Sequence, residues 1–541
     1  MPEIERREWL WAALFSGLVL FVSSAPYLAA YIFQPPDRVF NGAVFDRPDY
    51  AVHLASMHLG ARGEWQYRFL FTSESHPGAY VKLGYVALGQ VAGRLGISLP
   101  IVYQAARIFF GLSACMAIYL VFAFLFSQPF WRRTGYLLAL LGSGVGWLQI
   151  LLGKQPVADI SPIDFWLIDG YIFFSLVTFP HFALIITLIA GMICAFLAYL
   201  RGRSSGWLLL ACILGVLMQF IQPYAPILAD LTILGMVLGH WRIKRHLRVH
   251  EFSALLVLAI SQMPLLIYNA WVFRSSPVWR SFVAQNITLS PPLEYYLWGY
   301  LFFWLSGGLG IWRLLSDLKA SACHDCDDNV PMIFGAVAWI LGAMLLSFSP
   351  TSLQRRFVFC LTLPLAMLST YGLRQTENML STFRNPSWIS TKLRLLVAGL
   401  IGLSAISSFL LSFSVVLRAF SGSEELYDPA SLISALDWLG DHSERGEVVL
   451  GAERTSQLLA ARLGMPVYWG HPIETINYPI KAERVMELFA GRGDMRRFQQ
   501  EGVQWIVWGP YEREMAGRVD FGYELEKVYQ VQDVEVYRLH P

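Results

Sequence analysis

The chain has 541 residues, of which 55% are hydrophobic and only 15% are charged. Soluble globular chains carry about 25% charged residues, so this composition excludes an ordinary soluble protein. The 41 Lys and Arg residues nearly balance the 39 Asp and Glu residues, and this balance gives no reason to expect a nucleic-acid partner.

Apolar blocks recur along the chain, each roughly 18 to 25 residues long, which is the length that crosses the hydrocarbon core of a membrane. The first block lacks the small-residue cleavage site of a secretory signal, so we interpret it as a span. We expect about eleven spans, near residues 9–33, 99–127, 134–153, 179–200, 206–222, 224–241, 252–273, 294–313, 331–349, 356–373 and 395–418. The predicted fold class is an α-helical polytopic membrane protein.

Basic residues near the ends of the blocks predict orientation, because cytoplasmic loops carry an excess of Lys and Arg. They stand before the first span and after the second, fourth, sixth and tenth, as Arg6, Arg7, Arg132, Arg133, Arg201, Arg203, the run RIKRHLRVH, Arg374, Arg384, Lys392 and Arg394. These positions share one side only if the segment 76–97 does not cross. Lys82, Gln90 and Arg94 interrupt that segment, so we expect an interfacial helix on the outer surface. The N-terminus is then cytoplasmic, and the loop 34–98 is extracytoplasmic.

The composition changes after Arg418, where charged residues return. The stretch DPASLISALDWLGDHS has apolar residues at helical spacing. EVVLGA, MPVYWG and WIVWG are typical of strands, and KVYQVQDVEVYRL is typical of a closing hairpin. We therefore expect a membrane module over residues 1–420 and a soluble α/β domain over residues 421–541, which an odd number of spans places outside.

One pair of cysteines suggests a metal site. Cys323 and Cys326 flank His324 in the stretch ACHDCDD. Tetrahedral zinc needs four ligands, and no second cysteine pair stands at such a spacing. A polar cytoplasmic loop is therefore the favoured interpretation.

The stretch FDRPDY places two carboxylates beside a proline, shortly after the first span. On a helix that begins near Pro48, Asp46, Asp49, Tyr50 and His53 lie on one face, because steps of three and four residues return to the same side. Asp46 could simply cap this helix, with Asp49 in its first turn. Capping does not exclude catalysis, since a cap also fixes the position of a carboxylate that faces a pocket.

The stretch DRPDY resembles the first-loop motif of the GT-C superfamily of lipid-phosphate-sugar-dependent glycosyltransferases. In that motif an Asp of the first extracytoplasmic loop is commonly followed by Glu, and an aromatic residue stands four positions after the Asp. Asp46 and Tyr50 match, whereas Arg47 replaces the Glu and an acid reappears at Asp49. Two further stretches are similar to loops of this superfamily, namely GEWQYRFLFTSESHPGAYVKLGYVALGQVAGRLGI to the rest of its first loop and SPTSLQRRFVF to a late extracytoplasmic loop. The C-terminal stretches VYWGHPIETINYPIKAERVMELF and VQWIVWGPYERE resemble the C-terminal domain of bacterial members of the protein mannosyltransferase and lipid A aminoarabinose transferase type.

The resemblance implies transfer of a sugar from a polyprenyl-phosphate donor at the extracytoplasmic face. The acceptor hydroxyl then needs a base within hydrogen-bond reach, for which Asp46 is the first candidate and Asp49 a helper or the alternative. The leaving phosphate needs cationic donors. Arg355 and Arg356, at the outer mouth of a span, are the best pair, although they could instead contact lipid headgroups.

Further polar residues could bind the substrate. Arg107 lies inside a span, where it could contact phosphate or pair with an acid such as Asp230. The other candidates, each of which has a structural or solvated alternative, are Tyr50, His53, Glu74, His76, Asp169, His181, His471 and Glu474. A divalent metal ion could also bind, but the sequence holds no complete metal motif, so the metal stays open.

We therefore expect a multi-pass glycosyltransferase of the plasma or inner membrane. Its acceptor could be a lipid, a polysaccharide or a protein. Two alternatives remain. A non-catalytic flippase or transporter of lipid-linked sugars would line a path at the bilayer midplane with polar residues, and an oligosaccharyltransferase-like enzyme would move a preassembled glycan.

Overall fold

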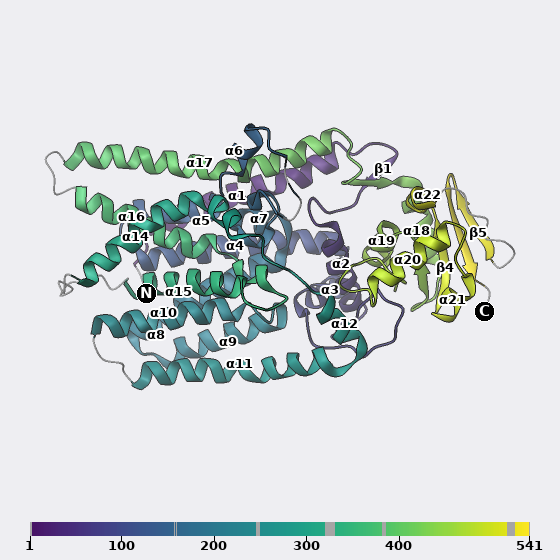
Figure 1. The fold of residues 1–541 in the computed structure, drawn as a ribbon, viewed down its shortest axis with the longest axis horizontal. Helices are drawn as coiled ribbons and strands as arrows, with labels where there is room; N and C mark the ends of the chain where they lie inside the picture. Colours follow the sequence, from purple (N-terminus) through teal and green to yellow (C-terminus); the bar gives the residue numbers. More distant parts are fainter. Residues whose placement is uncertain are drawn as a thin grey trace. The chain divides into compact units, whose positions relative to one another are not determined.

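The computed structural model describes residues 3–155, 157, 160–244, 249–319, 330–380, 386–516 and 525–539 (Figure 1). The chain divides into two compact units, which are described separately. The helical unit comprises Met1–Ala25, Ala106–Ile267 and Thr288–Ser414, and the mixed unit comprises Pro26–Ala105, Tyr268–Ile287 and Val415–Pro541. The predicted domain boundary at residue 420 stays a prediction.

Long helices dominate the helical unit, where α10 packs against both α8 and α15 (Figure 1). The helices with residues in this unit are α1 (Arg6–Ile32), α4 (Leu99–Leu125), α5 (Pro129–Leu141), α6 (Gly146–Leu151), α7 (Ile172–Thr178), α8 (Pro180–Gly202), α9 (Ser205–Ile221), α10 (Pro226–Lys244), α11 (Val249–Ser275), α13 (Leu293–Gly299), α14 (Leu301–Lys319), α15 (Val330–Ser347), α16 (Thr362–Leu380) and α17 (Pro386–Phe420), with the short 3₁₀ helices η1 (Ile163–Phe165), η2 (Ile168–Gly170) and η4 (Gln354–Val358).

Within the described residues, seven helical stretches are long and apolar enough to cross a membrane. They are Arg6–Ile32, Leu99–Leu125, Pro180–Gly202, Val249–Ser275, Val330–Ser347, Gln354–Leu380 and Thr391–Phe420. The helices Ser205–Ile221 and Leu301–Ser316 are apolar but shorter. The chain therefore has a polytopic helical membrane fold, while the count of eleven spans stays a prediction.

The third and eighth predicted spans are each broken into two helices, and the breaks meet. The first break separates α5 from α6, and the second separates α13 from α14. The Val145 N–H donates to the Trp298 carbonyl at 3.3 Å. A Cβ on Gly144 would lie 2.4 Å from the Gly299 carbonyl oxygen, so only glycine permits this approach. Sequence hydropathy missed both breaks, because the backbone groups that each break frees are satisfied by distant parts of the chain.

The mixed unit contains a four-stranded sheet in the order β3-β4-β6-β5. Its strands are β3 (Val448–Leu450), β4 (Val503–Trp508), β5 (Leu525–Val531) and β6 (Val534–Leu539). β3 and β4 are parallel, and the other neighbours are antiparallel. The strands expected in EVVLGA and WIVWG and the closing hairpin are confirmed. The stretch MPVYWG forms only a single bridge, between Val467 and Val449.

The mixed unit also contains helices and a second, short sheet. The helices are α2 (Arg47–Ala61), α3 (Leu83–Leu95), α12 (Pro277–Gln285), α18 (Ala430–His442), α19 (Glu453–Leu463), α20 (Tyr478–Phe489), α21 (Met495–Gln500) and α22 (Pro510–Ala516). The short sheet pairs β1 (Arg38–Phe40) with β2 (Tyr427–Pro429) in antiparallel register. Its strands join the first loop to the C-terminal segment.

The first loop also shares a hydrophobic core with the C-terminal segment. Val52 of α2, Phe71 of the loop and Trp279 of α12 belong to one buried cluster with Leu436 of α18 and Val507 of β4. Burial of large apolar side chains is the main favourable term in folding. The position of α2 is therefore set by packing against residues that come much later in the chain.

Glycines fix α2 against α3. A Cβ on Gly60 would lie 1.9 Å from the Val86 carbonyl oxygen, and a Cβ on Gly89 would lie 2.0 Å from the Met57 carbonyl oxygen. The two backbones therefore touch, which no larger residue would allow. α3 is the helix expected in the segment 76–97. It has 13 residues, too few to cross a membrane, and its interfacial placement stays a prediction.

Candidate active site

Helix α2 begins at the FDRPDY stretch and carries the two candidate acids. Asp46 is the N-cap residue, with left-handed backbone angles (φ 44°, ψ 62°), and its Oδ1 accepts a hydrogen bond from the Asp49 N–H at 3.3 Å. Pro48 and Asp49 occupy the first turn, where a fixed φ and a negative charge both favour the helix. The expected helix and cap are confirmed. Because a carboxylate offers about four lone-pair positions, the cap does not exclude a chemical role for Asp46.

Two aromatic residues on α2 pack against other rings. Tyr50 is buried and meets Tyr103 edge to face, with 5.0 Å between the ring centroids. Burial raises the pKa of the Tyr50 phenol, so this group is neutral. The His53 ring stacks on Tyr85 with 4.0 Å between centroids. These contacts stabilise α2, and substrate binding by Tyr50 and His53 stays a prediction.

His471 is a residue of the C-terminal segment that contacts Asp49 at the start of α2. Its Nε2 lies 3.2 Å from Oδ1 of Asp49, and the imidazole is almost fully buried whereas a third of the Asp49 side chain is exposed. The sequence named both residues as candidates without relating them. Their contact connects a carboxylate at the N-terminus of α2 to the segment that follows strand β3.

A buried acid, Glu474, lies on the same loop as His471. Its Oε1 accepts a hydrogen bond from the Tyr67 hydroxyl at 2.6 Å and forms an ion pair with Lys82. Burial and the nearby Glu474 carboxylate together raise the pKa of Tyr67 well above its usual value. A neutral phenol and a cation therefore both donate to this carboxylate. The sequence missed Tyr67, and the only signal for Lys82 was that it interrupts an apolar segment.

The remaining first-loop candidates form a neighbouring pair. Lys481 of α20 donates to Glu74 Oε2 at 2.8 Å and to the Tyr468 carbonyl at 3.1 Å. Burial lowers the pKa of Lys481, and burial also lowers the pKa of His76. His76 accepts the Phe69 N–H on Nε2 at 3.0 Å, which holds the loop. Glu74 and His76 thus have clear structural contacts, and their role in binding stays a prediction.

In the helical unit, η4 carries the arginine pair. Arg356 Nη1 lies 3.7 Å from Oδ2 of Asp169, and the Arg355 guanidinium lies over the Trp166 ring at 5.4 Å from its centroid. The Arg355 N–H donates to the Thr288 carbonyl at 3.0 Å. Three predicted residues, Arg355, Arg356 and Asp169, are therefore close neighbours. The Asp169 carboxylate orients the guanidinium of Arg356, and the Trp166 indole orients that of Arg355.

The other two candidates of this unit are buried among helices. Arg107 is 1% exposed and donates to the Leu176 carbonyl at 3.0 Å and to Ser24 Oγ at 2.8 Å. His181, in the first turn of α8, packs against the rings of Phe179 and Phe182. A phosphate-binding role for Arg107 and a substrate-binding role for His181 stay predictions.

The central expectation, that the candidate acids and the arginine pair line one cavity, involves both units. Asp46 and Asp49 belong to the mixed unit, and Arg355 and Arg356 belong to the helical unit. Their convergence on one cavity therefore stays a prediction. Among the described residues no group of three or more His, Cys, Asp and Glu side chains could hold a metal ion. The stretch with Cys323, His324 and Cys326 lies outside the described residues.

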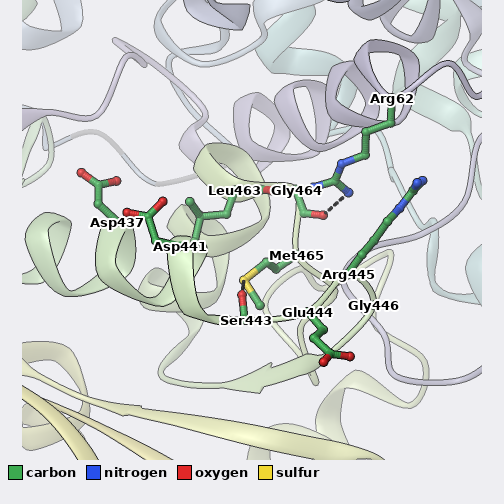
Figure 2. A pocket seen from close by; sticks show the side chains of 11 residues that line it. Arg62, Asp437, Asp441, Ser443, Glu444, Arg445, Gly446, Leu463, Gly464 and Met465 are labelled. Atoms are coloured by element: carbon green, nitrogen blue, oxygen red, sulfur yellow. Dashed lines mark hydrogen bonds between the residues drawn. The ribbon is translucent and has the colours of Figure 1, made fainter.

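The mixed unit also has a polar groove of about 470 Å³, which is separate from the contacts of Asp49, His471 and Glu474 (Figure 2). It lies between the end of α2, the end of α18 and the end of α19. Arg62 points across it and donates to the Gly464 and Leu463 carbonyls (Figure 2), and Arg445 pairs with Glu64. Its two arginines are thus engaged within the protein, and the groove contains none of the candidate acids.

Comparisons with known proteins agree on the fold. No protein-family model and no curated protein sequence matches the chain. The arabinofuranosyltransferase AftD from Mycobacteria is 14% identical over 99% of this chain, with a TM-score of 0.53, and the chain spans 40% of AftD. ArnT from Cupriavidus metallidurans in the apo state is 12% identical, with a TM-score of 0.51, over 97% of this chain and 98% of ArnT. The same ArnT bound to undecaprenyl phosphate is 12% identical, with a TM-score of 0.49 and the same coverage.

At such low identity the feature held in common is the fold. AftD and ArnT are both membrane glycosyltransferases of the GT-C superfamily. The resemblance that the motifs predicted is thus matched by an independent comparison of structures, and the chain shares its fold with AftD and ArnT.

Proposed function

We propose that this protein is a glycosyltransferase that moves a sugar from a polyprenyl-phosphate donor to an acceptor hydroxyl at the extracytoplasmic face of the membrane. The single observation that carries the proposal is a capped helix with Asp46 and Asp49 at its N-terminus in a chain of GT-C fold. Neither the fold nor the acidic cap would suffice alone, because a fold hosts many functions and an acidic cap is common.

The chemistry assigns separate tasks to the two groups of residues. The acceptor oxygen attacks the anomeric carbon, the bond from that carbon to the phosphate oxygen breaks, and its electron pair leaves with polyprenyl phosphate. The acceptor proton passes to a carboxylate, and Asp46 is the proposed base. Asp49 is the helper or the alternative base. A single displacement of this kind inverts the anomeric centre.

The leaving group is an anion, so its departure is favoured by cationic hydrogen-bond donors. Arg355 and Arg356 supply two guanidinium groups on η4, and Arg107 supplies a third in the same unit. Because Asp169 and Trp166 hold the pair in place, little reorganisation is needed when charge develops on the phosphate. A bidentate arginine contact suits a phosphate better than a lysine would.

The donor class is supported by one neighbour. The structure of ArnT bound to undecaprenyl phosphate contains a polyprenyl phosphate, and the apo form of that protein is similar in fold to this chain along nearly the whole length of both. A sugar on such a carrier is the substrate that the proposed residues require. The same neighbours favour transfer over transport, since AftD is an arabinofuranosyltransferase and ArnT an aminoarabinose transferase.

The test supplies the purified protein in lipid vesicles with a panel of polyprenyl-phosphate sugars, covering pentoses and hexoses. Release of free polyprenyl phosphate and formation of a glycosylated product are measured together. The proposal expects at least one donor to be consumed, and nucleotide sugars to be left intact. If no donor is consumed and the intact donor instead crosses the vesicle membrane, the protein is a flippase and the proposal is wrong.

A further inference from the structure

The loop that follows Gly470 is fixed against the first loop. Thr475 Oγ1 accepts the N–H groups of Gly470 and His471 at 3.1 and 3.2 Å, and it donates to the Phe71 carbonyl at 2.8 Å. The Ile476 N–H donates to Thr72 Oγ1 at 3.3 Å. His471 therefore sits on a short segment whose backbone is tied at both ends.

The hydrogen bonds of this loop decide which nitrogen of His471 carries a proton. Nδ1 accepts the N–H groups of Ile473 and Glu474 at 3.2 and 3.3 Å. A ring nitrogen that accepts has no hydrogen, and in a neutral imidazole the other nitrogen then carries it. Nε2–H is therefore the donor to Oδ1 of Asp49 at 3.2 Å.

This geometry gives the Asp49 side chain a hydrogen-bond donor that is fixed in place. Asp49 has a partly exposed side chain, and an exposed carboxylate samples several rotamers. The imidazole is 5% exposed and cannot move without breaking two backbone contacts. The donor is thus more rigid than the carboxylate that accepts from it.

We propose that His471 is a positioning residue, which holds the Asp49 carboxylate in the orientation required for sugar transfer. The inference rests on the proposed function and deepens it, because it makes the C-terminal segment part of the reaction. His471 touches neither donor nor acceptor in this account. It acts through Asp49, and misplacing a reacting group by about 1 Å can cost roughly 100-fold in rate.

Two substitutions separate the two contacts of the imidazole. In His471→Asn the amide oxygen replaces Nδ1 and accepts from the loop N–H groups, as asparagine does in turns, but the side chain is too short to reach Asp49. In His471→Gln the amide nitrogen replaces Nε2 and donates to Asp49, while the loop contacts are lost. His442→Asn changes the same residue type on the exposed end of α18 and is the matched control.

The readouts are kcat and KM for the donor, together with the melting temperature of each purified variant. We expect His471→Asn to keep the wild-type melting temperature and KM while its kcat falls roughly 10- to 100-fold. His471→Gln should melt earlier yet keep kcat within about threefold of wild type, and His442→Asn should change neither quantity.

Other patterns would overturn the inference. If kcat falls together with the melting temperature, so that His471→Gln has a lower kcat than His471→Asn, His471 only supports the loop. If all three variants turn over like the wild type, Asp49 needs no positioning, although the protein remains a transferase. If the wild type consumes no donor at all, the proposed function itself is wrong, which separates the two failures.

Discussion

The guanidinium of Arg47 lies 3.2 Å from the carboxylate of Asp428, whose side chain is fully buried. Arg47 stands directly after the proposed base, where the related motif commonly has Glu, and it points into the C-terminal segment instead. Arg454 Nε at 2.9 Å and the Tyr511 hydroxyl at 2.7 Å donate to the same Asp428 oxygen. The departure from the motif is thus explained by a buried ionic cluster that fixes the start of α2.

Removing Arg47 should destabilise the mixed unit. Burial lowers the pKa of Arg47 to about 10 in spite of the nearby Asp428, so the side chain is still charged at neutral pH and balances a buried carboxylate. Breaking a buried pair by deleting one partner costs about 3–5 kcal/mol. Arg47→Ala should therefore melt clearly earlier than the wild type, and Arg47→Lys, which keeps the charge, should lose less.

The control for this change is Arg280→Ala, on the exposed side of α12, which should alter stability by no more than about 0.5 kcal/mol. Melting temperatures of the purified variants in one detergent provide the measurement. Equal melting temperatures for Arg47→Ala and Arg280→Ala would mean that the cluster contributes nothing.

Acid should destabilise the mixed unit through His58. Burial lowers the pKa of His58 from 6.5 to about 4, although its Nε2 donates to the Ala461 carbonyl at 3.0 Å. Above pH 6.5 His58 is neutral in both the folded and the unfolded state, and its full contribution to stability is present. As the pH falls from 6.5 towards 4, the unfolded chain takes up the proton first, and stability falls.

His58→Gln keeps a donor for the Ala461 carbonyl and does not titrate in this range. The melting temperature of this variant should therefore depend less steeply on pH between 6.5 and 4 than that of the wild type. An unchanged slope would show that other groups account for the acid lability.

The arginine pair of η4 should matter for the donor. Arg356→Ala removes a charge-assisted hydrogen-bond donor from the proposed phosphate site, and loss of one such donor costs roughly 100- to 1000-fold in turnover. Arg356→Lys should recover only part of this loss, because an ammonium group cannot form a bidentate contact. Steady-state kcat/KM for the donor tests both variants, with Arg280→Ala as control. A wild-type value for Arg356→Ala would refute the assignment.

The proposed orientation can be tested by labelling. Ser75 lies exposed in the first loop, and Ser204 lies exposed between α8 and α9, on the side predicted to be cytoplasmic. A cysteine is introduced at one of these positions at a time, after Cys323 and Cys326 are changed to serine, and the other four cysteines of the chain are buried. A membrane-impermeant thiol reagent should label Ser75→Cys in intact cells, and Ser204→Cys only after lysis. The opposite pattern would place the candidate acids in the cytoplasm.

The length of the apolar blocks predicted most of the long helices correctly, because most of these blocks fold into one local element. The method failed where backbones from distant blocks touch. The break between α5 and α6 needs Gly144 to approach Gly299, a relation that no local window contains. The short strand β1 was missed for the same reason, since its partner β2 begins at Tyr427.

The sequence predicted which residues belong to the candidate site, but it did not predict which of them contact one another. Asp49 and His471 are separated by 422 positions, and each appeared alone as a polar residue near a proline. Glu474 was named as well, but its partners Tyr67 and Lys82 stand in stretches whose aromatic and apolar content hid them. Side-chain pairing across a shared core depends on packing, which sequence alone does not display.

The central claim is that Asp46 takes the acceptor proton, and Asp46→Asn tests it most directly. Asparagine caps a helix as well as aspartate does, so the variant keeps the Asp49 contact at the start of α2 and loses only the basic group. Donor consumption by the purified variant is compared with that of the wild type and of Asp49→Asn, at equal donor occupancy. The account predicts that Asp46→Asn still binds the donor while its turnover falls by about 100-fold or more. Wild-type turnover in Asp46→Asn would contradict the claim.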